Sequence, residues 1–77
     1  MTNTDTNKPV RKIRVGSVTA TIWKQQDSFY TASLERSYKD KDGNWKSTNS
    51  FSVDDLVVAA KVADMAADAI IALQSDA

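Results

Sequence analysis

Residues 10–51 alternate between apolar and polar positions in short runs, a pattern typical of strands that bury one face. The runs are separated by Gly16, by a polar turn over residues 25–27 and by the hairpin signal Asp42-Gly43. Because these connections are short, consecutive strands are expected to pair as an antiparallel meander. The predicted strands cover residues 10–15, 17–24, 28–38 and 45–51.

The second predicted strand has two different faces, because successive side chains point to opposite sides of a sheet. One face carries hydroxyl groups and Trp23, and the other is wholly apolar. The apolar side chains are Val18, Ala20 and Ile22. The third strand also starts with an apolar face, which Arg36 and Tyr38 continue to its end.

The chain after Ser52 is typical of one long helix. Ser52 is a good N-cap, Asp54 and Asp55 place negative charge in the first turn, and no Gly or Pro occurs from Val53 to Gln74. The predicted fold is therefore α+β, with four antiparallel strands followed by one C-terminal helix. Residues 10–74 form the single predicted domain.

This helix has more apolar surface than one sheet can cover. Its polar residues form only a narrow stripe of Asp54, Lys61, Asp64 and Asp68. A second surface must therefore cover it, and its many alanines suit close approach of two helices across a symmetry axis. We expect a homodimer that uses the helix, with contacts at Val58, Val62, Met65, Ala66, Ala69, Ile70 and Leu73.

Composition excludes several classes of function. The 77 residues contain no cysteine and no histidine, so there is no disulfide, no thiolate metal site and no histidine base. We expect no cofactor and no catalysis. Asp64 and Asp68 at the middle of the helix argue against a membrane span. Residues 1–9 are expected to be a disordered tail and 75–77 a short C-terminal tail, in a cytoplasmic protein that is nucleoid-associated if it is prokaryotic.

The formal net charge of zero hides a strong segregation of charge. Through Phe51 the chain has nine basic and five acidic residues, a net charge of +4, and from Ser52 onward one basic and five acidic residues, a net charge of −4. The basic part also contains all six aromatic residues. Cations interleaved with aromatic side chains are a footprint of nucleic-acid binding.

The order of the predicted elements resembles the single-stranded-DNA-binding domain of the transcriptional coactivator positive cofactor four, a Whirly-like fold. The similarity covers residues 10–73, and its most specific part is the segment Leu34 to Lys46, with the sequence LERSYKDKDGNWK. That family likewise has an aromatic residue near the end of the third strand, an acidic-Gly turn and a Lys that enters the fourth strand. The alternating Lys and Asp residues of the turn depart from the pattern, and Glu35, Asp40 and Asp42 would repel phosphate.

The resemblance implies a homodimer packed through its helices, whose sheets bind single-stranded DNA with little sequence preference. By position, Tyr38 matches the strand-three aromatic, Trp23 and Lys24 fall near the end of strand two, and Lys46 enters strand four. Together with the charge pattern, this predicts that Trp23 and Tyr38 stack on bases. The predicted phosphate contacts are Lys24, Arg36, Lys39 and Lys46, with Lys12 and Arg14 extending the path.

Several alternatives stay open at this point. Trp23 could instead pack against the N-terminal strand or a dimer partner, whereas Trp45 and Phe51 are expected to be structural. The bound strand could be RNA rather than DNA. The chain could also be a protein-interaction module that docks a peptide or a regulator on its edge strand or its sheet, without binding nucleic acid.

Overall fold

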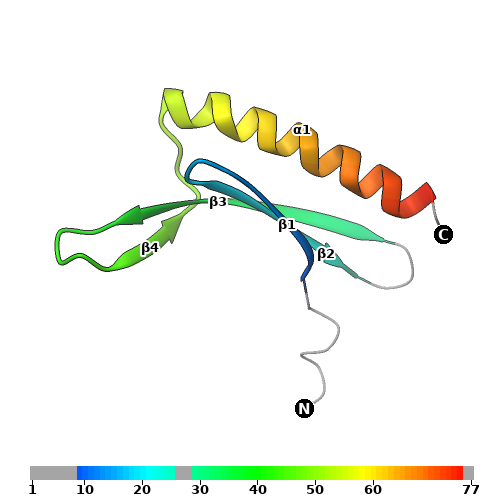
Figure 1. The fold of residues 1–77 in the computed structure, drawn as a ribbon, viewed down its shortest axis with the longest axis horizontal. Coiled ribbons are helices and arrows are strands. Elements are labelled where there is room, and N and C mark those ends of the chain that lie inside the picture. The colour runs from blue at the N-terminus through cyan, green and yellow to red at the C-terminus, as the bar shows by residue number, and fades with distance from the viewer. Residues whose placement is uncertain (1–8, 26–28, 76–77) are drawn as a thin grey trace, which may run out of the picture.

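The computed structural model describes residues 9–25 and 29–75, and it has the predicted ββββα architecture. The elements are β1 (Pro9–Val15), β2 (Val18–Lys24), β3 (Tyr30–Lys39), β4 (Trp45–Thr48) and α1 (Val53–Ser75). The strands form one antiparallel sheet in the order β1-β2-β3-β4, and α1 lies across one face of it (Figure 1). The prediction of an α+β meander followed by one helix is confirmed.

Several strand boundaries differ from the prediction by a few residues: β3 covers Tyr30–Lys39 rather than 28–38, and the start of β2 and the end of β4 differ for local reasons. Ser17 belongs to the turn rather than to β2, because Val15 pairs directly with Val18 and Gly16 has a positive φ of 61°. β4 ends at Thr48 instead of residue 51. The N–H of Ser50 donates a hydrogen bond to Thr48 Oγ1 at 3.1 Å, which turns the chain out of the sheet toward the helix.

The structured part of the chain begins and ends one residue beyond the predicted domain of residues 10–74. Pro9 begins β1 and is the register partner of Trp23, so it is not part of a tail. Ser75 is the last residue of α1. The rest of the two predicted tails (1–8 and 76–77), most of the predicted turn over 25–27 and the predicted first residue of the third strand, Ser28, lie outside the described residues.

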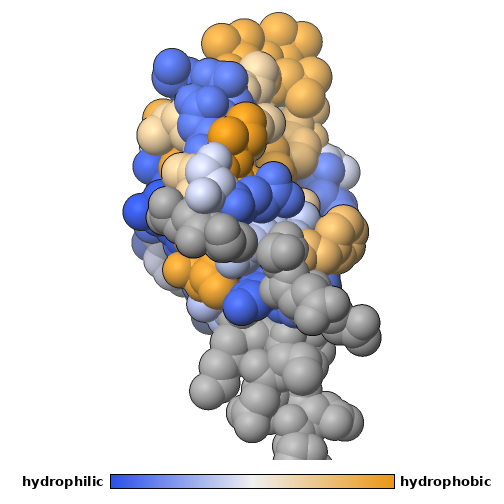
Figure 2. Space-filling model, turned by 90° about the vertical axis from the view of Figure 1, so that its right-hand side faces the viewer, coloured by the Kyte–Doolittle hydropathy of each residue, from blue (hydrophilic) through white to orange (hydrophobic). Residues whose placement is uncertain are grey.

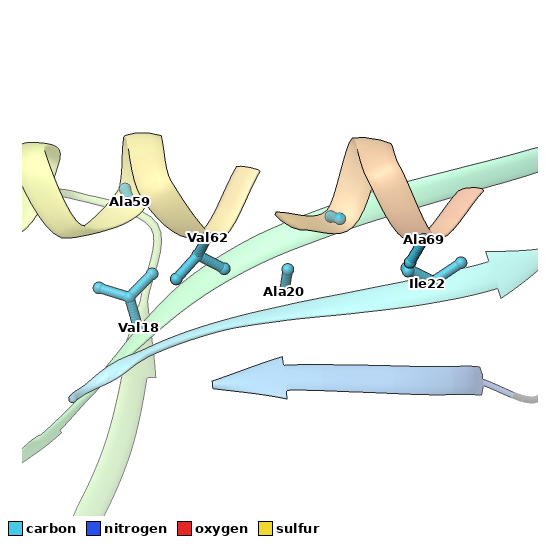
Figure 3. Packing of buried hydrophobic residues seen from close by; sticks show 7 residues of the cluster. Val18, Ala20, Ile22, Ala59, Val62 and Ala69 are labelled. Carbon is cyan, nitrogen blue, oxygen red and sulfur yellow. The ribbon is translucent and has the colours of Figure 1, made fainter. Parts of the chain in front are cut away.

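The core is a single layer of side chains between β2 and α1. The predicted apolar face of β2 points at the helix, and Val18 and Ile22 are almost completely buried (Figure 3). Small side chains opposite them allow the helix to approach the sheet closely. The helix side of the core consists of Ala59, Val62, Ala66 and Ala69.

The predicted N-cap of the helix is present. Ser52 Oγ accepts a hydrogen bond from the backbone N–H of Asp55 at 3.3 Å, and the backbone N–H of Ser52 donates to Asp55 Oδ2 at 3.4 Å. This reciprocal arrangement is a capping box in which Asp replaces the more usual Glu. It sets where α1 begins and holds the Asp55 carboxylate beside the end of the sheet.

The hairpin of β3 and β4 extends past the start of the helix. α1 packs against β1, β2 and β3 but not against β4, and the β4 end of the sheet lies away from the helix in Figure 1. Within the described part of the chain, α1 therefore does not cover the β4 side of this hairpin.

Candidate nucleic-acid interface

The sheet has an open face on the side away from α1. Residues paired directly across neighbouring strands point to the same side, so the register assigns this face, with an irregularity in β1 between Pro9 and Arg11. Among the described residues of the four strands, this face has no aliphatic side chain apart from the proline ring, and its charged residues are three cations and one acid. We call it the open face, and it consists of Pro9, Lys12, Arg14, Thr19, Thr21, Trp23, Thr31, Ser33, Glu35, Ser37, Lys39, Trp45 and Ser47.

Trp23 lies across the β2–β3 part of the open face. Its indole Nε1 donates a hydrogen bond to Ser33 Oγ at 3.1 Å, on the neighbouring strand. Thr21 is the register partner of Ser33 and is only 7% exposed, as expected for a residue beside a ring that spans the two strands. One face of the indole is thus directed at the sheet, and Trp23 as a whole is half-buried.

Trp45 marks the other end of the open face. It is 68% exposed, so within the single chain it does not have the structural packing role that was expected of it. The Lys39 ammonium lies 5.5 Å from its ring centroid, a cation–π distance. Trp45 also borders a shallow depression of about 330 Å³ together with Arg14 and Ser37. An exposed aromatic ring is therefore grouped with two cations.

The remaining predicted contacts lie on the other side of the sheet. The strand pairings place four of them on the same side of the sheet as the core residues: Lys24, Arg36, Tyr38 and Lys46. Tyr38 pairs directly with Lys46 in the β3–β4 hairpin. The structure therefore divides the predicted path into two groups. Lys12, Arg14, Trp23 and Lys39 share the open face, whereas the other four predicted residues do not.

Arg36 is engaged within the protein. Its Nε donates to the carbonyl oxygen of Ser50 at 3.2 Å and lies 3.2 Å from Asp55 Oδ2. Its guanidinium carbon is 5.7 Å from the centroid of the Tyr38 ring. These contacts join β3 to the start of the helix, and a phosphate would have to compete with the Asp55 carboxylate for this side chain.

The carboxylate of Asp40 is used in the hairpin turn. Its Oδ1 accepts hydrogen bonds from the N–H groups of Asp42 and Asn44, both at 2.9 Å, and its Oδ2 lies 3.7 Å from Lys46 Nζ. Lys46 and the two amides offset the negative charge of Asp40. The predicted repulsion of phosphate therefore applies mainly to Asp42 and Glu35, which are exposed.

Trp45 is the residue that the sequence prediction missed, although the alternation contained the signal. Trp45 and Ser47 are two residues apart in β4, so their side chains point to the same side of the sheet. Because Ser47 is polar, that side is expected to be the one that faces solvent. The neighbouring Lys39 belongs to the same row through its pairing with Trp45.

Other kinds of site find little support in the part of the chain that is described. Across residues 9–25 and 29–75, the acidic side chains form no group of three that could hold a metal ion. Within the same ranges, no helix is long and apolar enough to cross a membrane. Comparisons of the chain with protein-family models, with curated proteins and with solved structures find no match.

Proposed function

We propose that this protein binds single-stranded nucleic acid on its open face, with little preference for base sequence. The observation that carries the proposal is the pair of tryptophans on a face whose other residues are mainly hydroxyl-bearing, with three cations and one acid, Glu35. DNA is the proposed strand, and RNA is the alternative that the experiment below must include.

The chemistry of an unpaired strand suits this face. Each base has a free π-face, and stacking on an aromatic side chain contributes about 1 to 3 kcal/mol. Trp23 and Trp45 supply two such platforms, and Lys12, Arg14 and Lys39 lie on the same side to hold phosphates. Serine and threonine hydroxyls both donate and accept hydrogen bonds, so they discriminate weakly between bases.

A duplex fits this face less well. Reading the major groove requires a helix or a two-stranded ribbon that enters it, and stacking requires bases that are already unpaired. The open face belongs to a four-stranded sheet and has its aromatic rings at separate places. We therefore infer that single strands are preferred over duplexes.

In this proposal the protein acts as a transcriptional cofactor or regulator, or protects exposed strands during replication or recombination. It works in the cytoplasm, at the nucleoid in a prokaryote, and it needs neither a cofactor nor a catalytic residue. The charge segregation of the chain is consistent with this role, because the acidic helix covers the face that does not bind.

The first test is a titration followed by tryptophan fluorescence. Single-stranded DNA, single-stranded RNA and duplex DNA of about ten nucleotides per strand would be compared at about 50 and about 200 mM salt. Single strands should change the emission and bind more tightly than the duplex, and salt should weaken binding by about 0.7 log units per log unit of salt for each phosphate contacted. Equal or tighter binding of the duplex would count against the proposal.

The hairpin offers a matched pair of variants that identifies the face. Trp45→Ala removes a ring from the open face, and Tyr38→Ala removes one from the opposite side of the same hairpin. The first should weaken binding about 5- to 150-fold and the second should have a much smaller effect. The reverse order would move the site to the other side of the sheet. Circular dichroism must show that both variants are folded.

A second pair separates phosphate contacts from general charge. Lys39→Ala and Lys24→Ala remove the same charge, but only Lys39 lies on the open face. Lys39→Ala should lower affinity for all sequences alike and reduce the salt slope, while Lys24→Ala should leave the slope close to that of the parent. Equal effects would mean that only net charge matters.

One observation favours the protein-interaction alternative. β1 is an edge strand, and beside it a groove of about 460 Å³ separates it from α1, with Ile13, Met65 and Ala69 among its lining. An extended peptide could add a strand to β1 and place alternate side chains in this groove. This alternative becomes the better one if no oligonucleotide changes the fluorescence or binds at low salt.

A further inference from the structure

The sheet has a step where β4 ends. β4 pairs with β3 only between Arg36 and Lys39, whereas β3 reaches back to Tyr30. The step forms a depression of about 290 Å³, close to the lower end of the roughly 300 to 1,000 Å³ of small-molecule sites. A depression of this size suits one small planar group rather than a larger ligand. We call it the step pocket, and its lining consists of Ser33, Leu34, Glu35, Ser47, Thr48 and Asn49.

The step pocket lies between the two tryptophans of the open face. Trp23 is the register partner of Thr31 in β3. Trp45 is the register partner of Lys39, about 27 Å further along the same strand. Glu35, which lines the pocket, is midway between these two positions of β3. A nucleic-acid strand that stacks on both rings therefore passes over Glu35.

The carboxylate of Glu35 is exposed and available to a ligand. It is the acid of the open face within the described strands, and its two oxygens only accept hydrogen bonds. In the described ranges, the side-chain ion pairs are those of Arg36 and of Lys46, and neither involves Glu35. A negative charge on a face that holds phosphates lowers affinity. This cost is offset if the carboxylate contacts a base instead of the backbone of the strand.

The other polar groups of the step pocket include backbone groups at the edge of β3. The N–H of Ser37 donates to the carbonyl oxygen of Ser17 at 2.9 Å, on the β2 side. The backbone groups of successive residues in a strand point alternately to its two sides, so the N–H and C=O of Leu34 point to the side where β4 has ended. The pocket thus has hydrogen-bond donors beside its carboxylate. The side chains that add to them are those of Ser33, Ser47 and Asn49.

We propose that the step pocket binds one unpaired guanine base of the nucleic-acid strand, and that the Glu35 carboxylate recognises it. Guanine presents two adjacent donors, N1–H and the N2 amino group, and these match the two oxygens of a carboxylate. Adenine and cytosine place an acceptor beside their amino group. Thymine and uracil place an acceptor on each side of N3–H. Each of these four bases therefore turns a lone pair toward the carboxylate, which is unfavourable.

This inference rests on the proposed function and deepens it. Stacking on Trp23 and Trp45 and the phosphate contacts are indifferent to base identity. The step pocket adds a preference at one position of the bound strand, because a site with fixed donors and acceptors discriminates by the groups that it leaves unpaired. The donors of the pocket serve the O6 acceptor of the same guanine, and Glu35 serves its two donors.

The step pocket lies away from the apolar surface of α1. Figure 2 shows hydrophobic residues gathered over the helix, and α1 does not pack against β4. Of the predicted dimer contacts, Val62, Ala66 and Ala69 are buried against the protein's own sheet, so in this fold they are not available to a second copy. Contacts between copies through the exposed part of α1 would leave the pocket uncovered. The base preference can therefore be measured whatever the oligomeric state.

The first test changes only the ligand. A strand of about ten thymidines with dG, dI, dA or dC at one central position is titrated against the parent protein and followed by tryptophan fluorescence. Inosine is a close match for guanine, because it lacks only the N2 amino group. The dG strand should bind about 5- to 10-fold more tightly than the other three, the lower part of the range for a bidentate base contact, since the pocket is open to water.

The outcomes separate this inference from the proposed function. Equal affinities for the dG and dI strands, with all strands bound, would overturn the guanine site and leave the proposed function standing. No binding of any strand would overturn both. This comparison needs no variant, so it does not depend on whether a substituted protein folds.

The second test assigns the preference to Glu35. Glu35→Gln and Asp42→Asn are matched variants, because each converts an exposed carboxylate into the corresponding amide, and Asp42 lies in the hairpin turn outside the step pocket. Both variants should bind every strand somewhat more tightly, because each removes one negative charge. The ratio of dG to dI affinity should fall close to unity in Glu35→Gln and stay at the parent value in Asp42→Asn. A ratio that survives in Glu35→Gln, or that falls equally in both variants, would overturn the role of Glu35.

Discussion

The ion pair of Arg36 and Asp55 is the contact that we expect to hold the β3–β4 hairpin to the helical part of the protein. Arg36 Nε is shared between the Asp55 carboxylate and the Ser50 carbonyl oxygen, both at 3.2 Å. The two charged side chains are 27% and 26% exposed, so the pair is neither fully solvated nor buried. Replacing the partners singly and together, as Arg36→Gln and Asp55→Asn, measures their coupling.

The expected magnitude follows from the partial exposure. Surface pairs contribute about 0.2 to 1 kcal/mol, whereas loss of one partner from a buried pair costs about 3 to 5 kcal/mol. We expect a coupling free energy of about 1 kcal/mol for this intermediate pair. Arg36→Gln alone should cost about 1 kcal/mol more than the coupling, since the hydrogen bond to Ser50 is also lost.

The coupling free energy is obtained by urea denaturation, followed by circular dichroism, of the parent, the two single variants and the double variant. Added salt at about 1 M should reduce the coupling, because partly exposed charges are screened. A coupling below about 0.3 kcal/mol, which is within the error of additivity, would refute the reasoning. A coupling that does not change with salt would show that the contact is not electrostatic.

Three further predictions concern the fold. Ile22→Ala should lower the free energy of unfolding by about 2 to 5 kcal/mol, seen as a lower urea midpoint at an unchanged slope, and a change under 1 kcal/mol would contradict the assigned core. Gly43→Ala should cost about 1 to 2 kcal/mol through its φ of 85° alone, since nothing lies within 4 Å of the added Cβ, and Gly43→Asn should cost less in the same assay. Asp40→Ala should speed amide hydrogen exchange in the hairpin while leaving β2 protected, and uniform acceleration would argue against a local role.

The parts of the fold that depend on local chemistry were predictable from the sequence. A few neighbouring residues are enough to predict each of three features: the alternation around Ile22, the turns at Gly16 and Gly43, and the Ser52 cap. The end of β4 was not, because it depends on a turn at Ser50 and on Arg36 from a distant strand. The alternation of neighbouring residues cannot predict this contact between Arg36 and Ser50.

The side of α1 that meets the sheet was also beyond sequence reasoning. A helix that is apolar over most of its circumference can turn either Val62 or Ala63 inward, and the shape of the sheet decides between them. The open face was easier to predict from the sequence. The alternation along the strands indicates that Trp23, Lys39 and Trp45 lie on the same side of the sheet. Matching residues by position to a known family instead combined residues from both sides of the sheet.

The β4 side of the β3–β4 hairpin does not pack against α1, and this affects how the protein can change over evolutionary time. The buried core comes from β2 and α1, and β4 contributes nothing to it. Substitutions in β4 and its turn therefore carry little penalty for folding, provided that the glycine and the turn carboxylate stay. The segment that holds Trp45 is thus the place where the proposed binding can diversify, while the selection that keeps the protein folded acts on a different set of residues.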